Sequence, residues 1–168
     1  VTPTVSWKPD QNQTWTLDYD YRRIEIVPDN YGILFKNGQL IPVDRKLKYY
    51  SPFNFTEQEI HRITLQHEWS ENESFMLRNN FVYEGRDLSF VRNAIGSINA
   101  AGQFASRNAR EQTDNADYLQ YQIEAVRKFE TGPWLHTLLM GFEYERANID
   151  TVRSDIALAN IVDPFNPV

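Results

Sequence analysis

Alternation of apolar and polar side chains with a period of two is the feature that most limits how this chain folds. Between Trp15 and Tyr21 every second residue is aromatic or aliphatic, whereas the residues between them are Thr or Asp. The same alternation recurs over residues 63–69, 75–84, 119–125 and 134–145. Because successive side chains of a strand point to opposite faces, the pattern predicts strands with one apolar and one polar face. Counting the segment that ends at Lys8, we expect about six strands of roughly 8–13 residues, longer than most strands of soluble sheets.

The connections between these strands alternate between short and long. The short ones are polar and cover Pro9–Gln13, Ser70–Glu73 and Glu130–Pro133. The long stretches, which we expect to be loops, run over residues 27–56, 85–117 and from 150 to the end. Loops beyond about 12–15 residues are uncommon in compact domains and are usually functional. Short turns at one end and long loops at the other are typical of an outer-membrane β-barrel, with periplasmic turns and extracellular loops.

Aromatic residues mark both ends of the expected strands. Those beside the short turns are Trp7, Trp15, Trp69, Phe75, Phe129 and Trp134. Those toward the opposite ends are Tyr21, Tyr83, Tyr118 and Tyr144. Amphipathic rings favour the membrane interface, so the two rows predict two membrane girdles. The strand from Trp134 to Tyr144 extends about 33 Å, and a tilt of about 40° projects this length onto the ~25 Å apolar band of an outer-membrane barrel.

The charged side chains on the opposite faces must then face a hydrated interior. An Arg or Lys in contact with mid-bilayer lipid would cost about 2–4 kcal/mol, and these faces carry residues such as Asp18, Arg78 and Glu143. The predicted fold class is therefore all-β, an antiparallel up-and-down transmembrane β-barrel. Since closing a barrel takes about eight strands, we expect residues 1–168 to be part of one larger barrel domain. A soluble antiparallel sandwich with one solvated face is the alternative fold.

Composition and motifs exclude several classes of function. The chain has no Cys, which excludes disulfides, thiol nucleophiles and Cys-ligated zinc or iron–sulfur sites. A net charge of −6 argues against binding to nucleic acid. No G-x-S-x-G, H-E-x-x-H or P-loop motif is present, so we expect no enzyme and no cofactor. Glu57, Glu59 and His61 share one strand face, but a solvated strand end is a simpler interpretation than a metal site. His67 and His136 are expected to anchor the interface rather than to ligate metal.

Four segments of the chain are similar to one known family. Residues 3–10 resemble its P-x-hydrophobic-x-W-x-P hairpin, and residues 129–144 resemble a strand pair with the pattern G-x-x-H-x-hydrophobic-hydrophobic-x-G-x-x-Y. The loop segment 38–45 and the terminal segment 163–168 are also similar to family segments. Taken in this order, the segments resemble the β-barrel of the TonB-dependent siderophore receptors, the family that includes ferrichrome-type receptors.

The resemblance implies a fold, a location and a function. It implies a segment of a barrel of about 22 strands in the bacterial outer membrane. The family's plug domain and TonB box are not found in these residues, so coupling to TonB would use parts of the receptor absent from this chain. The implied function is uptake of ferric siderophores, with iron arriving already chelated and the chain supplying barrel strands and ligand-facing loops. Expected partners are the ferric siderophore, outer-membrane lipid and lipopolysaccharide.

The expected loops are the candidate ligand surface. Charged residues give residues 27–56 a net charge of +2 and residues 85–114 a net charge of +1, which would attract anionic iron chelates or lipopolysaccharide. Clustered aromatic residues and Arg are typical of recognition surfaces. The candidates are Tyr31, Phe35, Arg45, Tyr49, Tyr50, Phe53, Phe90 and Arg92. For any single ring, packing of the loops against each other is the simpler role.

Two rival functions stay open. A soluble all-β binding module with long recognition loops would be monomeric in plain buffer, whereas a membrane segment would need detergent or refolding. An outer-membrane barrel enzyme would need a nucleophile such as Ser89 or Ser97.

Overall fold

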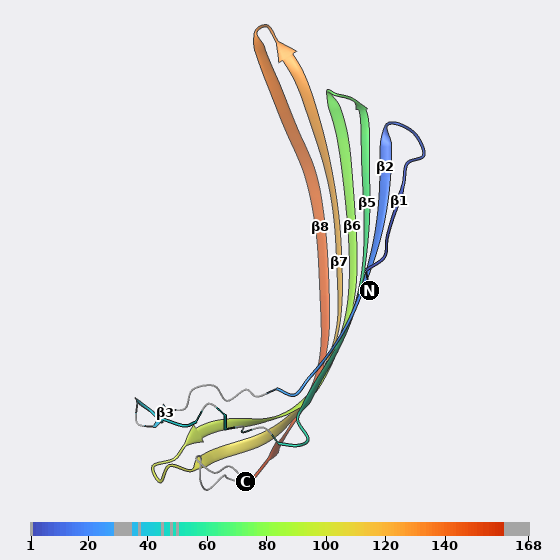
Figure 1. Cartoon of the computed structure of the whole chain (residues 1–168). Coiled ribbons are helices and arrows are strands. Elements are labelled where there is room, and N and C mark those ends of the chain that lie inside the picture. The colour runs from blue at the N-terminus through green and yellow to red at the C-terminus, as the bar shows by residue number, and fades with distance from the viewer. Residues whose placement is uncertain are drawn as a thin grey trace. The chain divides into compact units, whose positions relative to one another are not determined.

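The computed structural model of the 168-residue chain describes residues 2–28, 35–36, 38–44, 46–47, 49 and 51–159, with backbone alone at 94–97 and 104–106. Six strands lie side by side in chain order in one sheet (Figure 1). They are β1 (Thr4–Trp7), β2 (Gln13–Ile26), β5 (Phe55–Asn72), β6 (Phe75–Ile98), β7 (Phe104–Thr131) and β8 (Trp134–Ala157). A separate antiparallel pair is formed by β3 (Phe35–Lys36) and β4 (Gln39–Leu40). The described part of the chain contains no helix long and apolar enough to cross a membrane.

Contacts divide the chain into two units. Unit 1 comprises Val1–Arg23, Glu59–Asp87 and Asn115–Asp150, and unit 2 comprises Ile24–Gln58, Leu88–Asp114 and Thr151–Val168. Strands β2, β5, β6, β7 and β8 contribute residues to both units. The three short turns predicted from the sequence all belong to unit 1.

The strands are longer than the sequence pattern predicts. Strands β6, β7 and β8 contain 24, 28 and 24 residues. The stretch 85–117, expected to be a loop, is strand except for a short turn at 99–103, and β8 continues to Ala157. The prediction of long loops was therefore wrong at these two places. Its physical reason is that strand pairing satisfies backbone N–H and C=O groups whatever the side chains are, so pairing continues after the apolar alternation stops.

The two faces of the sheet in unit 1 differ as the alternation predicts. In the first hairpin, Trp7 pairs with Trp15 on one face, whereas the Thr4 hydroxyl donates to Asp18 on the other. We call these the apolar face and the charged face. The charged face is crossed by ion pairs between neighbouring strands, including the one between Arg62 of β5 and Glu84 of β6.

The apolar face of unit 1 is exposed. Among the described residues, the buried hydrophobic side chains are Tyr49 and Phe90, and both belong to unit 2. On the apolar face of β8, by contrast, Trp134 is 70% exposed and both Met140 and Phe142 are 60% exposed. Soluble monomers rarely expose contiguous apolar patches of this kind. Unit 1 is therefore a sheet whose apolar side has no protein core among the described residues.

Unit 2 has a small core beside a polar clamp. The Tyr49 ring packs against Ile41, Val43, Leu47 and Ile98. The side chain of Asn93, 1% exposed, donates to the Tyr49 carbonyl oxygen at 2.8 Å and to Ser51 Oγ at 3.1 Å. Asn54 Nδ2 donates to Asn93 Oδ1 at 2.7 Å. These bonds fasten the segment that precedes β5 to strand β6.

We predict that Asn93→Leu loosens this segment. The change keeps the number of side-chain heavy atoms but removes the hydrogen bonds that Asn93 makes with the Asn54 side chain and with the Tyr49 carbonyl oxygen, which should cost about 1–3 kcal/mol of local stability. Hydrogen exchange of residues 49–54, followed by mass spectrometry, should accelerate accordingly. The same exchange should be unchanged in a control variant, Asn115→Leu, at an exposed position of β7. Equal exchange in both variants would contradict the clamp.

Candidate functional site

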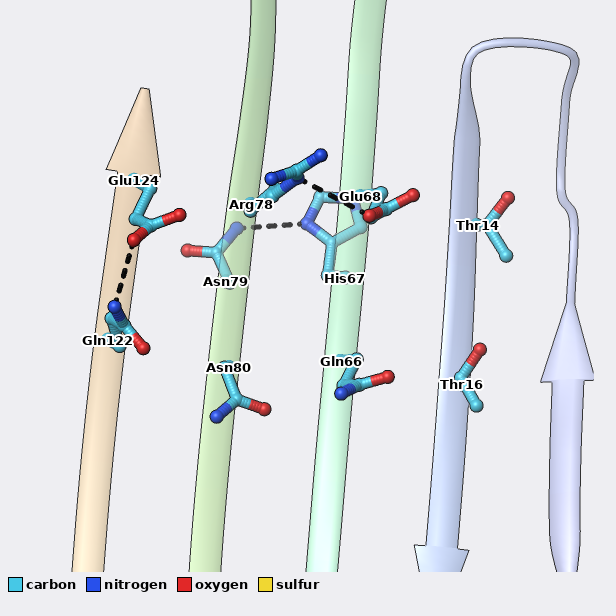
Figure 2. Close-up of a pocket in the computed structure, with 10 residues that line it drawn as sticks. All are labelled: Thr14, Thr16, Gln66, His67, Glu68, Arg78, Asn79, Asn80, Gln122 and Glu124. Atoms are coloured by element: carbon cyan, nitrogen blue, oxygen red, sulfur yellow. Dashed lines mark hydrogen bonds and ion pairs between the residues drawn. The ribbon is translucent and has the colours of Figure 1, made fainter. Parts of the chain in front are cut away.

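The charged face of unit 1 carries a polar groove of about 340 Å³ that crosses four strands (Figure 2). Its lining residues come from β2, β5, β6 and β7, and we call it the charged-face groove. Those of the charged face are Thr14, Thr16, Gln66, Glu68, Arg78, Asn80, Gln122 and Glu124, and the lining also includes His67 and Asn79, whose side chains belong to the apolar face. The short turns lie close to one end of these strands, so the groove forms on regular strand backbone rather than on loops.

The charged-face groove carries more carboxylates than cations. Arg78 Nε lies 3.4 Å from Glu68 Oε1, and Gln122 Nε2 donates to Glu124 Oε1 at 2.9 Å (Figure 2). The side-chain oxygen of Asn80 is buried and has no partner among the described residues. With two carboxylates and one guanidinium, the lining has a net charge of −1. The groove is therefore suited to polar or cationic groups that donate hydrogen bonds.

A polar row crosses the apolar face where Asn79 interrupts its alternation. The Tyr121 hydroxyl donates to Asn79 Oδ1 at 3.0 Å, and Asn79 Nδ2 donates to His67 Nδ1 at 3.1 Å. The His67 ring stacks on Trp15 with centroids 4.0 Å apart. The Nε2 atom of His67 is buried and has no hydrogen-bond partner among the described residues. Both polar atoms of the Asn79 side chain thus have partners.

The residues considered for a metal site have other partners. His61 Nδ1 lies 2.8 Å from the Tyr19 hydroxyl, and Glu59 accepts from Tyr21 and lies 3.8 Å from Arg23. Within the described ranges, no three His, Asp or Glu side chains form a group that could hold a metal ion. These contacts explain the arrangement of His61 and Glu59 without a metal.

The residues predicted to form girdles lie on the apolar face, with one correction among the aromatic residues. Their exposed fractions include 61% for Trp7, 42% for Phe129, 38% for Tyr83 and 48% for Tyr144. Partly exposed rings are those of Trp15, Trp69, Phe75 and Tyr21. Tyr118 lies instead on the charged face, where its hydroxyl donates to Glu145 Oε1 at 3.0 Å. The distance of Tyr118 from the short turn suggested that it belongs to a girdle. It lies three positions from Tyr121 on β7, however, so the two side chains point to opposite faces of the sheet.

The loop candidates divide into exposed and buried side chains. Phe35 and Phe53 are 59% and 44% exposed, whereas Tyr49 and Phe90 are 5% and 8% exposed. The Arg92 guanidinium lies 4.6 Å from the centre of the Phe90 ring. The remaining candidates lie outside the described residues: Tyr31, Arg45 and Tyr50. Packing within unit 2 thus accounts for the two buried rings, and the exposed pair offers accessible aromatic surface.

Sequence reasoning missed a charged cluster in unit 2. Asp155 accepts from Arg110 Nε at 2.9 Å and Asn108 Nδ2 at 2.8 Å, and lies 3.0 Å from Arg153. The hydrogen bond from Arg110 is the main cause of a lowered pKa of the Asp155 carboxyl. The available signal was the alternation of polar residues at 108 and 110 and at 153 and 155, which marks one face of two paired strands.

Comparison with known proteins establishes the fold. No family model and no curated protein matches the sequence. Among solved structures, the siderophore receptor PiuA from Acinetobacter baumannii is 21% identical, with a TM-score of 0.78 over 89% of this chain and 23% of that chain. The closed form of the ferric-catecholate import receptor Fiu from E. coli K12 is 16% identical, with a TM-score of 0.80 over 99% of this chain and 27% of that chain. This chain spans about a quarter of each neighbour, and the predicted all-β, up-and-down barrel wall is confirmed as its fold.

The charged cluster around Asp155 predicts how the stability of the fold depends on pH. Since the pKa of Asp155 in the folded chain lies below its ordinary value of 3.8, its carboxylate stabilises the fold above that value, and this contribution is lost as pH falls through the folded pKa. Arg110→Gln should raise the pKa toward the ordinary value. A carboxyl NMR titration of Asp155 measures the midpoint, and Arg146→Gln, outside the cluster, should leave it unchanged. A midpoint at the ordinary value in the unaltered protein would contradict the predicted shift.

Proposed function

We propose that this chain is part of one barrel domain of an outer-membrane receptor that takes up ferric siderophores. The observation that carries the proposal is the exposed apolar face of unit 1, which we assign as the lipid contact surface. Leu17 is 45% exposed there, and Met140 and Phe142 are each 60% exposed. Each Å² of apolar surface removed from water stabilises by about 25 cal/mol, so a hydrocarbon environment removes the main cost of this exposure.

The charged face then lines a hydrated lumen. Its ion pairs, such as the one between Arg78 and Glu68, remain hydrated in that arrangement. The open sheet has two edge strands, β1 and β8, and edges are not tolerated in hydrocarbon because their backbone groups would lack partners. Further strands of the receptor would pair with these edges, consistent with a chain that spans about a quarter of its structural neighbours.

The names of the structural neighbours support the choice of a transported ligand. One is a siderophore receptor and the other imports ferric catecholate, so we propose a ferric siderophore as the ligand of this receptor. The exposed rings of Phe35 and Phe53, together with Arg92, are the described side chains that we propose for its binding. Outer-membrane lipid and lipopolysaccharide would contact the apolar face and its rim. TonB would act through other parts of the receptor, and we propose no catalytic role.

The alternative, a soluble binding module, conflicts with the composition of the exposed surface. Such a module would keep in water a face that includes Trp134, 70% exposed, and Phe142, 60% exposed. Exposed patches of this kind promote association. Solubility of the protein as a monomer without detergent would favour the module over the receptor.

Adjacent substitutions on β8 test the assignment of the faces. Met140 and Leu139 are both 60% exposed, but they lie on the apolar and charged faces respectively. Met140→Arg should destabilise the full-length protein in lipid vesicles by about 2–4 kcal/mol, the cost of a cation near mid-bilayer. Leu139→Arg should cost much less, because its guanidinium would enter the lumen. Urea titration of the vesicle-inserted protein measures both, and equal losses would refute the assignment.

Iron uptake tests the function itself. In cells that lack the gene, uptake of radioactive iron supplied as catecholate, hydroxamate or carboxylate chelates should fall for one class and recover with the full-length gene. Dissipating the proton gradient should also stop the recovered uptake. Phe35→Ala and Phe53→Ala should weaken binding of that chelate about fivefold to thirtyfold, the usual effect of removing an interface anchor worth about 1–2 kcal/mol. Unchanged uptake of all three chelates would overturn the proposal.

A further inference from the structure

A second hollow on the charged face of unit 1 surrounds an arginine. Its volume is about 190 Å³, the liquid volume of roughly six water molecules. Strands β6, β7 and β8 contribute to its lining, which includes Glu84, Arg86, Ala116, Tyr118 and Ala147. The two alanines stand on neighbouring strands where longer side chains would fill the space. We call this hollow the Arg86 pocket.

Arg86 has no partner within the described part of the chain. Its Nε atom is buried and makes no hydrogen bond there. The two carboxylates of the lining are already engaged, because Glu84 accepts from Arg62 Nε at 2.7 Å and Asp117 accepts from the Tyr83 hydroxyl at 2.8 Å. The wall of unit 1 therefore offers Arg86 no free carboxylate at these two positions.

An unpartnered guanidinium in a hollow is a recognition feature. Buried polar atoms nearly always have a partner, and an arginine side chain in a protein carries a positive charge. Its planar fork of N–H donors matches the two oxygens of a carboxylate in a bidentate pair. The space beside Ala116 and Ala147 is large enough for a carboxylate with the carbon atoms that bear it.

We propose that the Arg86 pocket binds a carboxylate group that approaches from the charged face. The group belongs either to an acidic side chain of polypeptide that occupies the lumen or to a carboxylate-bearing solute. Both present the same chemistry to Arg86. The inference rests on the proposed function only in treating the charged face as the wall of a lumen, and its test measures side-chain reactivity and stability rather than uptake.

Labelling with phenylglyoxal, which modifies accessible guanidinium groups, tests the pocket in the full-length protein in detergent. Mass spectrometry compares Arg86 with Arg78, an arginine of the same strand and face that is already paired with Glu68. For a solute site, Arg86 should react in the free protein and be slowed at least fivefold by saturating citrate, while Arg78 is unaffected. For polypeptide occupancy, Arg86 should react at least tenfold more slowly than Arg78 with or without citrate. Reaction as fast as that of Arg78 and unaffected by citrate would overturn the proposal.

If Arg86 is labelled slowly, the cause is either a carboxylate partner or burial without a partner. Thermal unfolding of variants distinguishes the two. Arg86→Met removes the charge but keeps an unbranched apolar stem, so a carboxylate from the polypeptide would lose its partner and the unfolding midpoint should fall by several degrees. Arg86→Lys should recover most of that loss. Simple burial predicts that Arg86→Met leaves the midpoint unchanged or raises it, and that result would overturn polypeptide occupancy. Arg78→Met serves as the control for loss of a cation from this face.

Discussion

Backbone hydrogen bonding between neighbouring strands is the interaction on which the rest of this structure depends. The described residues include very few buried hydrophobic side chains, and unit 1 has none of them. Even the turns are held by the backbone of the next strand: Ser70 N donates to the Asn12 carbonyl and Lys128 N to the Ser74 carbonyl, each at 2.7 Å. With strand pairing holding the sheet together, each face is free to carry its own chemistry.

The two faces use that freedom in opposite ways. On the charged face, side chains pair across strands and leave hollows where a residue is short or a polar atom lacks a partner, as at Arg86. On the apolar face, Tyr121 and His67 of the neighbouring strands supply hydrogen-bond partners for the Asn79 amide. A buried or lipid-facing amide without partners would cost several kcal/mol. A polar residue such as Arg86 on the charged face therefore stays available for binding, whereas Asn79 on the apolar face is hydrogen-bonded to neighbouring strands.

Local patterns predicted the elements of unit 1 because strand periodicity is a property of adjacent residues. The alternation from Trp15 to Tyr21 identified both the strand and its two faces, and turn residues such as Gly132, at φ +59°, marked a hairpin. Contacts between distant residues could not be predicted in this way. Asn54 and Asn93 are 39 positions apart, and the Arg86 pocket depends on small residues of other strands. The prediction for Tyr118 was wrong because it used only the distance of this residue from the turn. It did not consider which face of the sheet an even-numbered residue of β7 occupies.

The polar row on the apolar face has a consequence for how this sequence can diverge. Its members, Trp15, His67, Asn79 and Tyr121, come from four separate hairpin strands but share one chain of stacking and hydrogen bonds. Replacing Asn79 alone by an aliphatic residue would remove the hydrogen-bond partner of the Tyr121 hydroxyl and of the His67 imidazole. Replacing these three polar residues together would yield an ordinary apolar surface. Coupled positions of this kind are non-additive. Homologues should therefore inherit the row whole or lose it whole, and intermediates should be rare.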